Sequence, residues 1–180
     1  MKRLLLFTCV AFFAISCNND SDKGETKPAA AASADVKYDY AYTLDEPYKN
    51  WQPGDQQHVV NVLKSLKAWE TGDIDACMTM FADSVDVRFD GFRQKFSKDS
   101  LKTFFAAGRA GVSSVSIKMN DWESVISSDK KEQWVTLWYD ETTTDKAGKT
   151  ETIAIVDDVK IVDGKCTVLD QKIQHYPAKK

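Results

Sequence analysis

The 180-residue sequence has little of what metal and nucleic-acid sites require. It contains only two histidines and four cysteines, too few to suggest a metal centre. It has 24 lysine and arginine residues against 27 aspartate and glutamate residues, so its net charge of −3 is opposite to the charge of a surface that binds phosphate backbones. It also lacks a glycine-rich phosphate loop and a serine elbow motif. We therefore expect no metal, no cofactor and no nucleic-acid partner.

Long hydrophobic runs are missing as well, and the mean hydropathy of −0.41 excludes a polytopic membrane protein. The one sustained apolar run, residues 4–15, follows Lys2 and Arg3. It is shorter than the ~20 residues that a bilayer-spanning helix needs. A basic start and a short apolar run are typical of a secretory signal peptide, which we assign to residues 1–16.

The apolar run ends at Ala14-Ile15-Ser16-Cys17, and polar residues follow at once. Small residues before a cysteine resemble the lipobox, where a bacterial signal peptidase cuts and the cysteine receives lipid. The polar start also resembles many lipoproteins of the Bacteroidota. The resemblance implies a palmitate-bearing Cys17 and a lipid anchor in the cell envelope, at the outer membrane. The alternative is an ordinary cleavage site in which Cys17 has no role.

Residues 17–50 are rich in Asp, Lys and Ala and contain few large aliphatic side chains. Such a segment buries too little apolar surface to offset its ordering entropy, so we expect a flexible tether. Residues 51–178 then form one domain. Its pattern predicts helices that begin at Asp55, Asp73 and Ser97, and a strand over 85–89. Four alternating runs follow, over roughly 112–127, 131–144, 149–162 and 165–176.

Short breaks between the last four runs predict antiparallel hairpins, and hence an α+β domain with helices on one face of a curved sheet. For the last hairpin, a three-residue loop, 162–164, separates apolar from charged residues better than a two-residue loop. Asp157 then faces the helices, opposite Leu169. Cys166 faces away from them, so a disulfide with Cys77 is not expected.

Three segments resemble the nuclear transport factor 2-like superfamily, SnoaL-like branch: Gly72-Asp73-Ile74-Asp75-Ala76, Met80-Phe81-Ala82-Asp83 and Asp163-Gly164-Lys165. The resemblance implies a cone-shaped, cystatin-like fold in which three N-terminal helices pack on a curved antiparallel sheet around a pocket. The family includes isomerases, cyclases, dehydratases and binding modules, so the fold does not settle the function.

The ketosteroid isomerase branch uses a base aspartate, a tyrosine and an aspartic acid. The resemblance aligns these positions with Phe89, Ser65 and Asp157, and only Asp157 matches. We predict that Asp157 lies in an apolar pocket, where burial raises its pKa.

The remaining candidates share the face of Asp157. We expect Gln171, Phe89, Leu169 and Ile173 to contact a ligand, and we consider His175, beside Glu151, as a second catalytic residue. The facing of Trp122, Trp134 and Trp138 stays open.

Two functions are compatible with these residues. The first is an envelope lipoprotein whose pocket binds a small, mostly hydrophobic molecule or a partner. The second is a cyclase, isomerase or dehydratase that uses Asp157 as acid or base. We also expect a homodimer through the outer sheet face, because Val156, Val168 and Cys166 make that face apolar.

We predict that Cys17→Ala releases the protein from the membrane fraction, because the lipid chains on Cys17 provide the anchor. Fractionation followed by immunoblotting measures the effect. A variant that still sediments with membranes as the wild type does contradicts the lipid anchor.

Overall fold

A computed structural model describes residues 39–176. Cys17, the expected signal peptide and residues 17–38 of the expected tether lie outside the described residues. Residues 39–43 belong to one unit and contain no helix or strand, and a second unit begins at Leu44. All helices and strands described below belong to this second unit.

The described residues contain three helices: α1 (Gln56–Thr71), α2 (Ile74–Met78) and α3 (Lys98–Ala110). Each begins where the sequence predicts, at a side chain that accepts a backbone N–H bond: Asp55, Asp73 and Ser97. Helix α1 ends at Gly72, whose φ of 84° is a left-handed conformation that glycine adopts without steric cost. None of the described helices has the length and apolarity needed to cross a bilayer.

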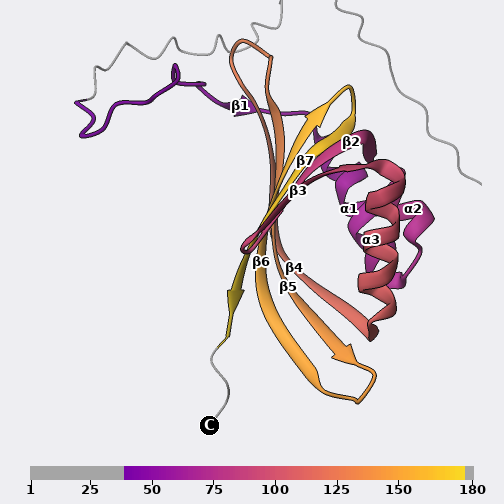
Figure 1. Ribbon diagram of the computed structural model, residues 1–180. Helices are drawn as coiled ribbons and strands as arrows, with labels where there is room; N and C mark the ends of the chain where they lie inside the picture. Colours follow the sequence, from indigo (N-terminus) through magenta and orange to yellow (C-terminus); the bar gives the residue numbers. More distant parts are fainter. Residues whose placement is uncertain (1–38, 177–180) are drawn as a thin grey trace, which may run out of the picture. The chain divides into compact units, whose positions relative to one another are not determined.

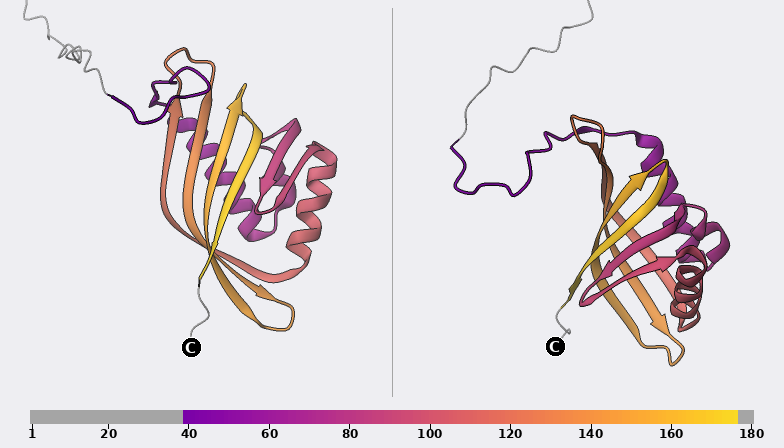
Figure 2. Two further views of the ribbon diagram at one scale, coloured as in Figure 1. Left: turned by 60° about the vertical axis from the view of Figure 1, so that its left-hand side comes forward. Right: turned by 45° about the horizontal axis from the view of Figure 1, so that its top comes forward.

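The described strands form one seven-stranded sheet. Its strands are β1 (Gln52–Pro53), β2 (Phe81–Phe89), β3 (Phe92–Ser97), β4 (Val112–Ile126), β5 (Gln133–Asp145), β6 (Thr150–Val162) and β7 (Lys165–His175). Their spatial order is β1-β4-β5-β6-β7-β2-β3. The helices lie on one side of this sheet, and the long strands β4 to β6 curve (Figures 1 and 2). The α+β class is therefore confirmed.

Three features of the sheet differ from the sequence-based prediction, the first being the short strand β1, which was not expected. The sheet is mixed rather than antiparallel, because β2 pairs with β7 in parallel. Strand β3 was not predicted: it is an edge strand in which only Phe96 is buried, so its sequence carries little apolar alternation.

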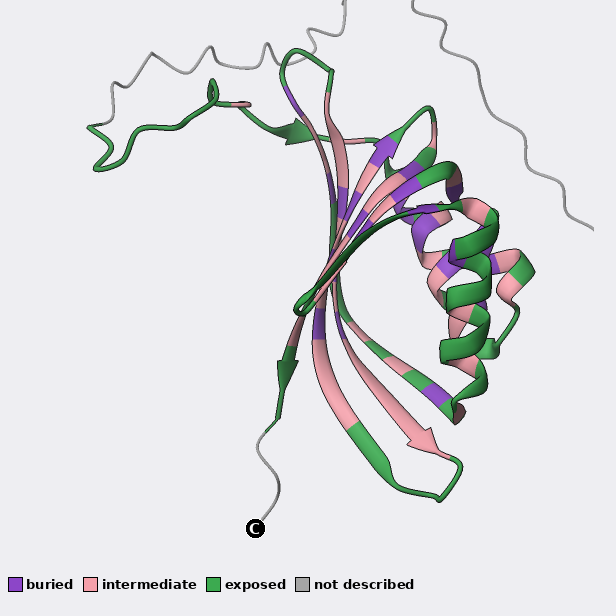
Figure 3. Cartoon of the chain, in the orientation of Figure 1, coloured by how far each residue is buried: buried purple, intermediate pink, exposed green. Residues whose placement is uncertain are grey.

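The core lies between the helices and the inner face of the sheet, which is the face that the helices cover. Buried residues are concentrated in the strand centres and on the helix sides that face the sheet (Figure 3). Leu101 of α3, Val87 of β2 and Val135 of β5 are completely buried there. Because these side chains come from distant parts of the chain, their packing fixes the helices over the sheet.

The β6–β7 hairpin corrects the predicted loop. Val162 pairs with Lys165, so the turn consists of Asp163 and Gly164 alone. Both have positive φ values, 49° and 72°, as a two-residue hairpin turn of this type requires. The register then shifts between Lys160 and Ile161, through a bulge on β7.

This bulge explains why the predicted inner face of Asp157 is right and its predicted cross-strand partner is wrong. It leaves Asp157 on the inner face but places it opposite Gln171 instead of Leu169. The two-residue turn, by contrast, places Cys166 inward, opposite Ile161, where the residue is 1% exposed. The expectation that Cys166 faces away from the helices is therefore wrong, and it no longer supports an apolar outer face.

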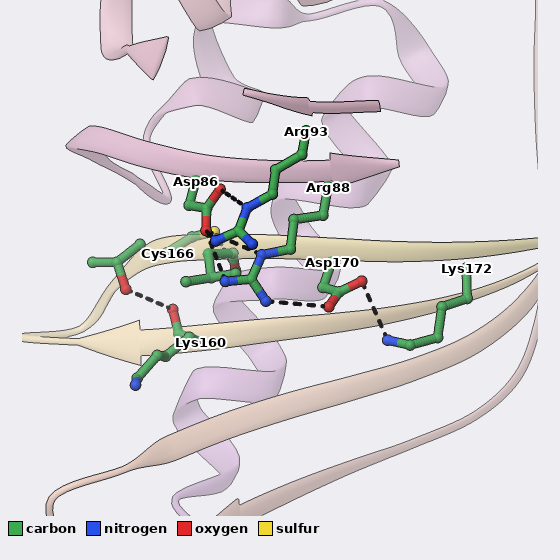
Figure 4. A network of polar contacts seen from close by, with 9 residues as sticks. Asp86, Arg88, Arg93, Lys160, Cys166, Asp170 and Lys172 are labelled. Atoms are coloured by element: carbon green, nitrogen blue, oxygen red, sulfur yellow. Dashed lines mark hydrogen bonds and ion pairs between the residues drawn. The ribbon is translucent and has the colours of Figure 1, made fainter. Parts of the chain in front are cut away.

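The outer face carries a chain of ion pairs across the sheet (Figure 4). Arg93 contacts Asp86 at 2.9 Å, and Asp86 contacts Arg88 at 2.7 Å. The chain continues through Asp170 and Lys172, at 3.5 and 3.4 Å. Hydrogen bonds from Arg93 and Arg88 lower the pKa of Asp86. The outer face therefore carries paired positive and negative side chains beside its apolar ones.

Candidate functional site

A cavity of about 390 Å³ lies between the inner sheet face and the helices α1 and α3. Its lining is mostly apolar. Six aromatic side chains contribute to it: Trp69, Phe81, Phe89, Phe104, Phe105 and Tyr139. Such a concave, largely apolar space with a few polar groups is typical of small-molecule sites.

Three side chains on neighbouring strands form a polar cluster on the cavity wall. The Tyr139 hydroxyl of β5 donates to Asp157 Oδ2 of β6 at 2.8 Å. The Gln171 amide of β7 donates to Asp157 Oδ1 at 3.0 Å and lies 3.5 Å from the Tyr139 hydroxyl. Asp157 is 5% exposed, so its carboxylate depends on these two donors in place of water.

Burial raises the pKa of Asp157 from 3.8 to about 6. The bonds from Gln171 and Tyr139 oppose that rise because they favour the ionised form, whereas the nearby Glu141 carboxylate adds to it. Burial and the negative charge of Asp157 raise the pKa of the Tyr139 phenol well above its usual value. Asp157 is thus poised to exchange a proton near neutral pH, while Tyr139 remains a donor.

Glu141 is a second carboxylate in the cavity. It follows Tyr139 by two positions on β5 and therefore points to the same face. The indole N–H of Trp69 donates to its Oε2 at 3.1 Å. Burial raises the pKa of Glu141, and the bond from Trp69 partly offsets this rise.

Tyr139 and Glu141 were not among the residues singled out from the sequence. The signal that identifies them is the alternation of β5, in which Val135, Leu137, Tyr139 and Glu141 occupy successive inward positions. Trp134 and Trp138 occupy the intervening positions, and the Lys160 ammonium lies 5.5 Å from the Trp134 ring. Neither of these tryptophans lines the cavity, and Trp122 is 46% exposed.

The structure brings four of the proposed ligand-contacting residues to the cavity: Asp157, Gln171, Phe89 and Leu169. Ile173 and His175 do not line it, since they lie further along β7. The His175 ring is exposed and lies 3.4 Å from Glu151, so it is not brought together with Asp157.

Other functional groups around the cavity are sparse. Ser65, at the family's tyrosine position, lines the cavity and donates to the Cys77 carbonyl at 2.7 Å. Cys77 and Cys166 are both free and both line the cavity. Within residues 39–176, no group of three or more His, Cys, Asp or Glu side chains is arranged to hold a metal ion.

Comparisons with known proteins agree with this architecture. No family model and no curated protein matches the chain. Among solved structures, a cystatin-fold protein from Novosphingobium aromaticivorans has a TM-score of 0.54 and 16% identity, over 64% of this chain and 97% of its own. An NTF2-like protein of unknown function from Exiguobacterium has a TM-score of 0.54 and 14% identity, over 63% and 98%.

A third neighbour is an LEH-like epoxide hydrolase from M. tuberculosis, with a TM-score of 0.53 and 14% identity over 66% of this chain and 84% of its own. Together these likenesses define the class: an α+β, cystatin-like domain. More particularly, the fold is that of the nuclear transport factor 2-like superfamily, so the resemblance inferred from the sequence is confirmed at the level of fold.

We predict that Asp157 titrates near pH 6 and that Tyr139→Phe moves its midpoint upward, because the variant removes a donor that favours the charged form. Since the pKa is raised by folding, wild-type stability falls as the pH rises from about 4 to about 6. The loss relative to Asp157→Asn reaches about 3 kcal/mol and persists at higher pH. Carboxyl-carbon NMR and denaturation at several pH values measure both effects.

Tyr176→Phe is the matched control, because its hydroxyl bonds to Asp140 at 2.8 Å instead of to Asp157. It should leave the Asp157 midpoint unchanged. A wild-type midpoint at or below ~3.9, the value of a solvated aspartate, contradicts the burial argument.

Proposed function

We propose that this domain binds a small, mostly hydrophobic molecule in the cavity between the sheet and the helices α1 and α3. The observation that carries the proposal is the aromatic cavity of about 390 Å³ with the buried Asp157 on its wall. Apolar walls provide binding energy by desolvation, while a few fixed polar groups orient the ligand. The epoxide hydrolase among the structural neighbours supports a small-molecule site in this fold.

We further propose that the protein is an envelope lipoprotein of the SnoaL-like branch, anchored through Cys17. The lipobox resemblance supports this assignment. A homodimer through the outer sheet face belongs to the same proposal. Trp134, Trp138, Val156 and Val168 on that face support it, because each is only half-buried in the single chain.

A second candidate function is acid–base catalysis on the bound molecule. The specific observation in its favour is the buried Asp157 with a pKa of about 6, hydrogen-bonded to the phenol of Tyr139. A carboxyl group with a pKa near neutrality serves both as proton acceptor and as proton donor. The first candidate requires only that the cavity holds the ligand, without any proton transfer.

We predict that Ala107→Phe weakens binding of N-phenyl-1-naphthylamine, a neutral dye that fluoresces in apolar surroundings. Ala107 lines the cavity from α3, so a larger side chain there occupies ligand space. A loss of about tenfold in affinity is expected, as for a displaced apolar group worth about 1.4 kcal/mol. Fluorescence titration gives the dissociation constants.

Ala106→Phe is the control, because both alanines are exposed on α3 but only Ala107 lines the cavity. It should bind the dye as the wild type does. If both variants bind equally well, the dye lies elsewhere; if the wild type does not bind it, the binding proposal fails.

To separate catalysis from binding, we predict that the wild type accelerates exchange of the α-protons of 2-tetralone with D₂O and that Asp157→Asn does not. The reason is that exchange requires a base near the ketone, whereas dye binding requires only the cavity. Proton NMR measures the exchange rate. Retained dye binding in Asp157→Asn, with equal exchange rates in both proteins, argues against the catalytic candidate.

A further inference from the structure

The cavity has an unbalanced charge. Two carboxylates, Asp157 and Glu141, line it, whereas none of its described lining residues is Lys, Arg or His. Burial opposes ionisation of both groups. A buried negative charge without a positive partner is unfavourable, so these carboxylates favour a ligand that carries a positive charge.

The hydrogen-bond donors of the cavity are already engaged. The Trp69 indole donates to Glu141 Oε2, and the Tyr139 hydroxyl and Gln171 amide donate to Asp157. Among the described residues, Glu141 Oε1 accepts no hydrogen bond. What the site presents to a ligand is therefore acceptors and negative charge.

The positive charge that acts on Glu141 is Arg109, and it lies outside the cavity lining. Its guanidinium donates to the backbone carbonyls of Trp69 and Glu70 at 3.3 and 3.4 Å, and to that of Val112 at 3.5 Å. Because these bonds direct the group toward the end of α1, Arg109 does not pair with Glu141.

Aromatic rings adjoin the Glu141 end of the cavity. Trp69, which bonds Glu141, has its ring 5.9 Å from that of Phe105. The Phe105 ring lies 5.5 Å from that of Phe81. Aromatic faces attract cations, most strongly when water is excluded, and tryptophan is the best of them.

We propose that the ligand is a hydrophobic organic cation, such as a tertiary amine or quaternary ammonium, with its positive group beside Glu141 and Trp69. The proposal rests on the small-molecule function above and names its ligand class. An anion would face two carboxylates at this site. A neutral molecule would gain no charge attraction from Glu141.

Three probes of similar shape test the inference: phenyltrimethylammonium, its neutral carbon analogue tert-butylbenzene, and the anion benzenesulfonate. Titrations are followed by protein NMR at pH 8 with the folded domain in the full chain. We expect the cation to bind at least as tightly as the neutral analogue, despite its stronger hydration. We expect no binding of the anion.

The decisive variant is Glu141→Gln, which keeps an acceptor for Trp69 and removes the charge. It should weaken binding of the cation by about tenfold and change that of tert-butylbenzene by less than about twofold. Glu141→Asp, which keeps the charge, should retain the preference for the cation. Glu123→Gln, an exposed carboxylate outside the cavity, controls for net charge.

The outcomes separate this inference from the function on which it rests. If Glu141→Gln weakens both probes equally, or if the anion binds as tightly as the cation, the cation proposal is overturned while dye binding still supports a small-molecule site. If neither the cation, the neutral analogue nor the dye binds to the wild type, both proposals fall together.

Discussion

The buried carboxylate of Asp157 is the constraint on which the site depends. A charged group with so little exposure is tolerated only where donors replace its lost hydration. Tyr139 and Gln171 supply those donors at 2.8 and 3.0 Å, from the strands on either side. The three central strands must therefore keep their mutual register, since a slip of one residue in β6 would turn Asp157 away from both donors.

A single bulge on β7 allows the tight turn of the last hairpin and the pairing of Asp157 with Gln171 to exist together. Asp163-Gly164 is a strong two-residue turn, and without a correction it would place Asp157 opposite Asp170. The shift between Lys160 and Ile161 moves Gln171 into that position instead. An amide donor thus lies where a second carboxylate would have been repelled.

Much of the fold could be predicted from local chemistry. The capping residues Asp55, Asp73 and Ser97 gave the helix starts, and the odd positions of β6 gave the inward face of Asp157. The parallel partner of β2 could not be predicted, because it depends on contacts between distant segments. The inward side of Cys166 was missed because the two-residue turn separates apolar from charged residues only when a bulge follows it. The inward position of Tyr139 could not be predicted for a different reason: β5 has bulky residues on both faces, so its sequence does not say which face is inside.

The strand order has a consequence for how the domain folds. Strand β7, the last of the described strands, lies between β6 and β2, and so joins the β2–β3 hairpin to the rest of the sheet. The hairpin from the first half of the domain thus has no place in the sheet until the final strand is available. Folding that depends on such non-local pairing is slow. The chain between the paired strands loses entropy when it closes, and only afterwards do the new contacts stabilise it. The sheet is accordingly completed only once β7 has been synthesised, not while the earlier strands emerge.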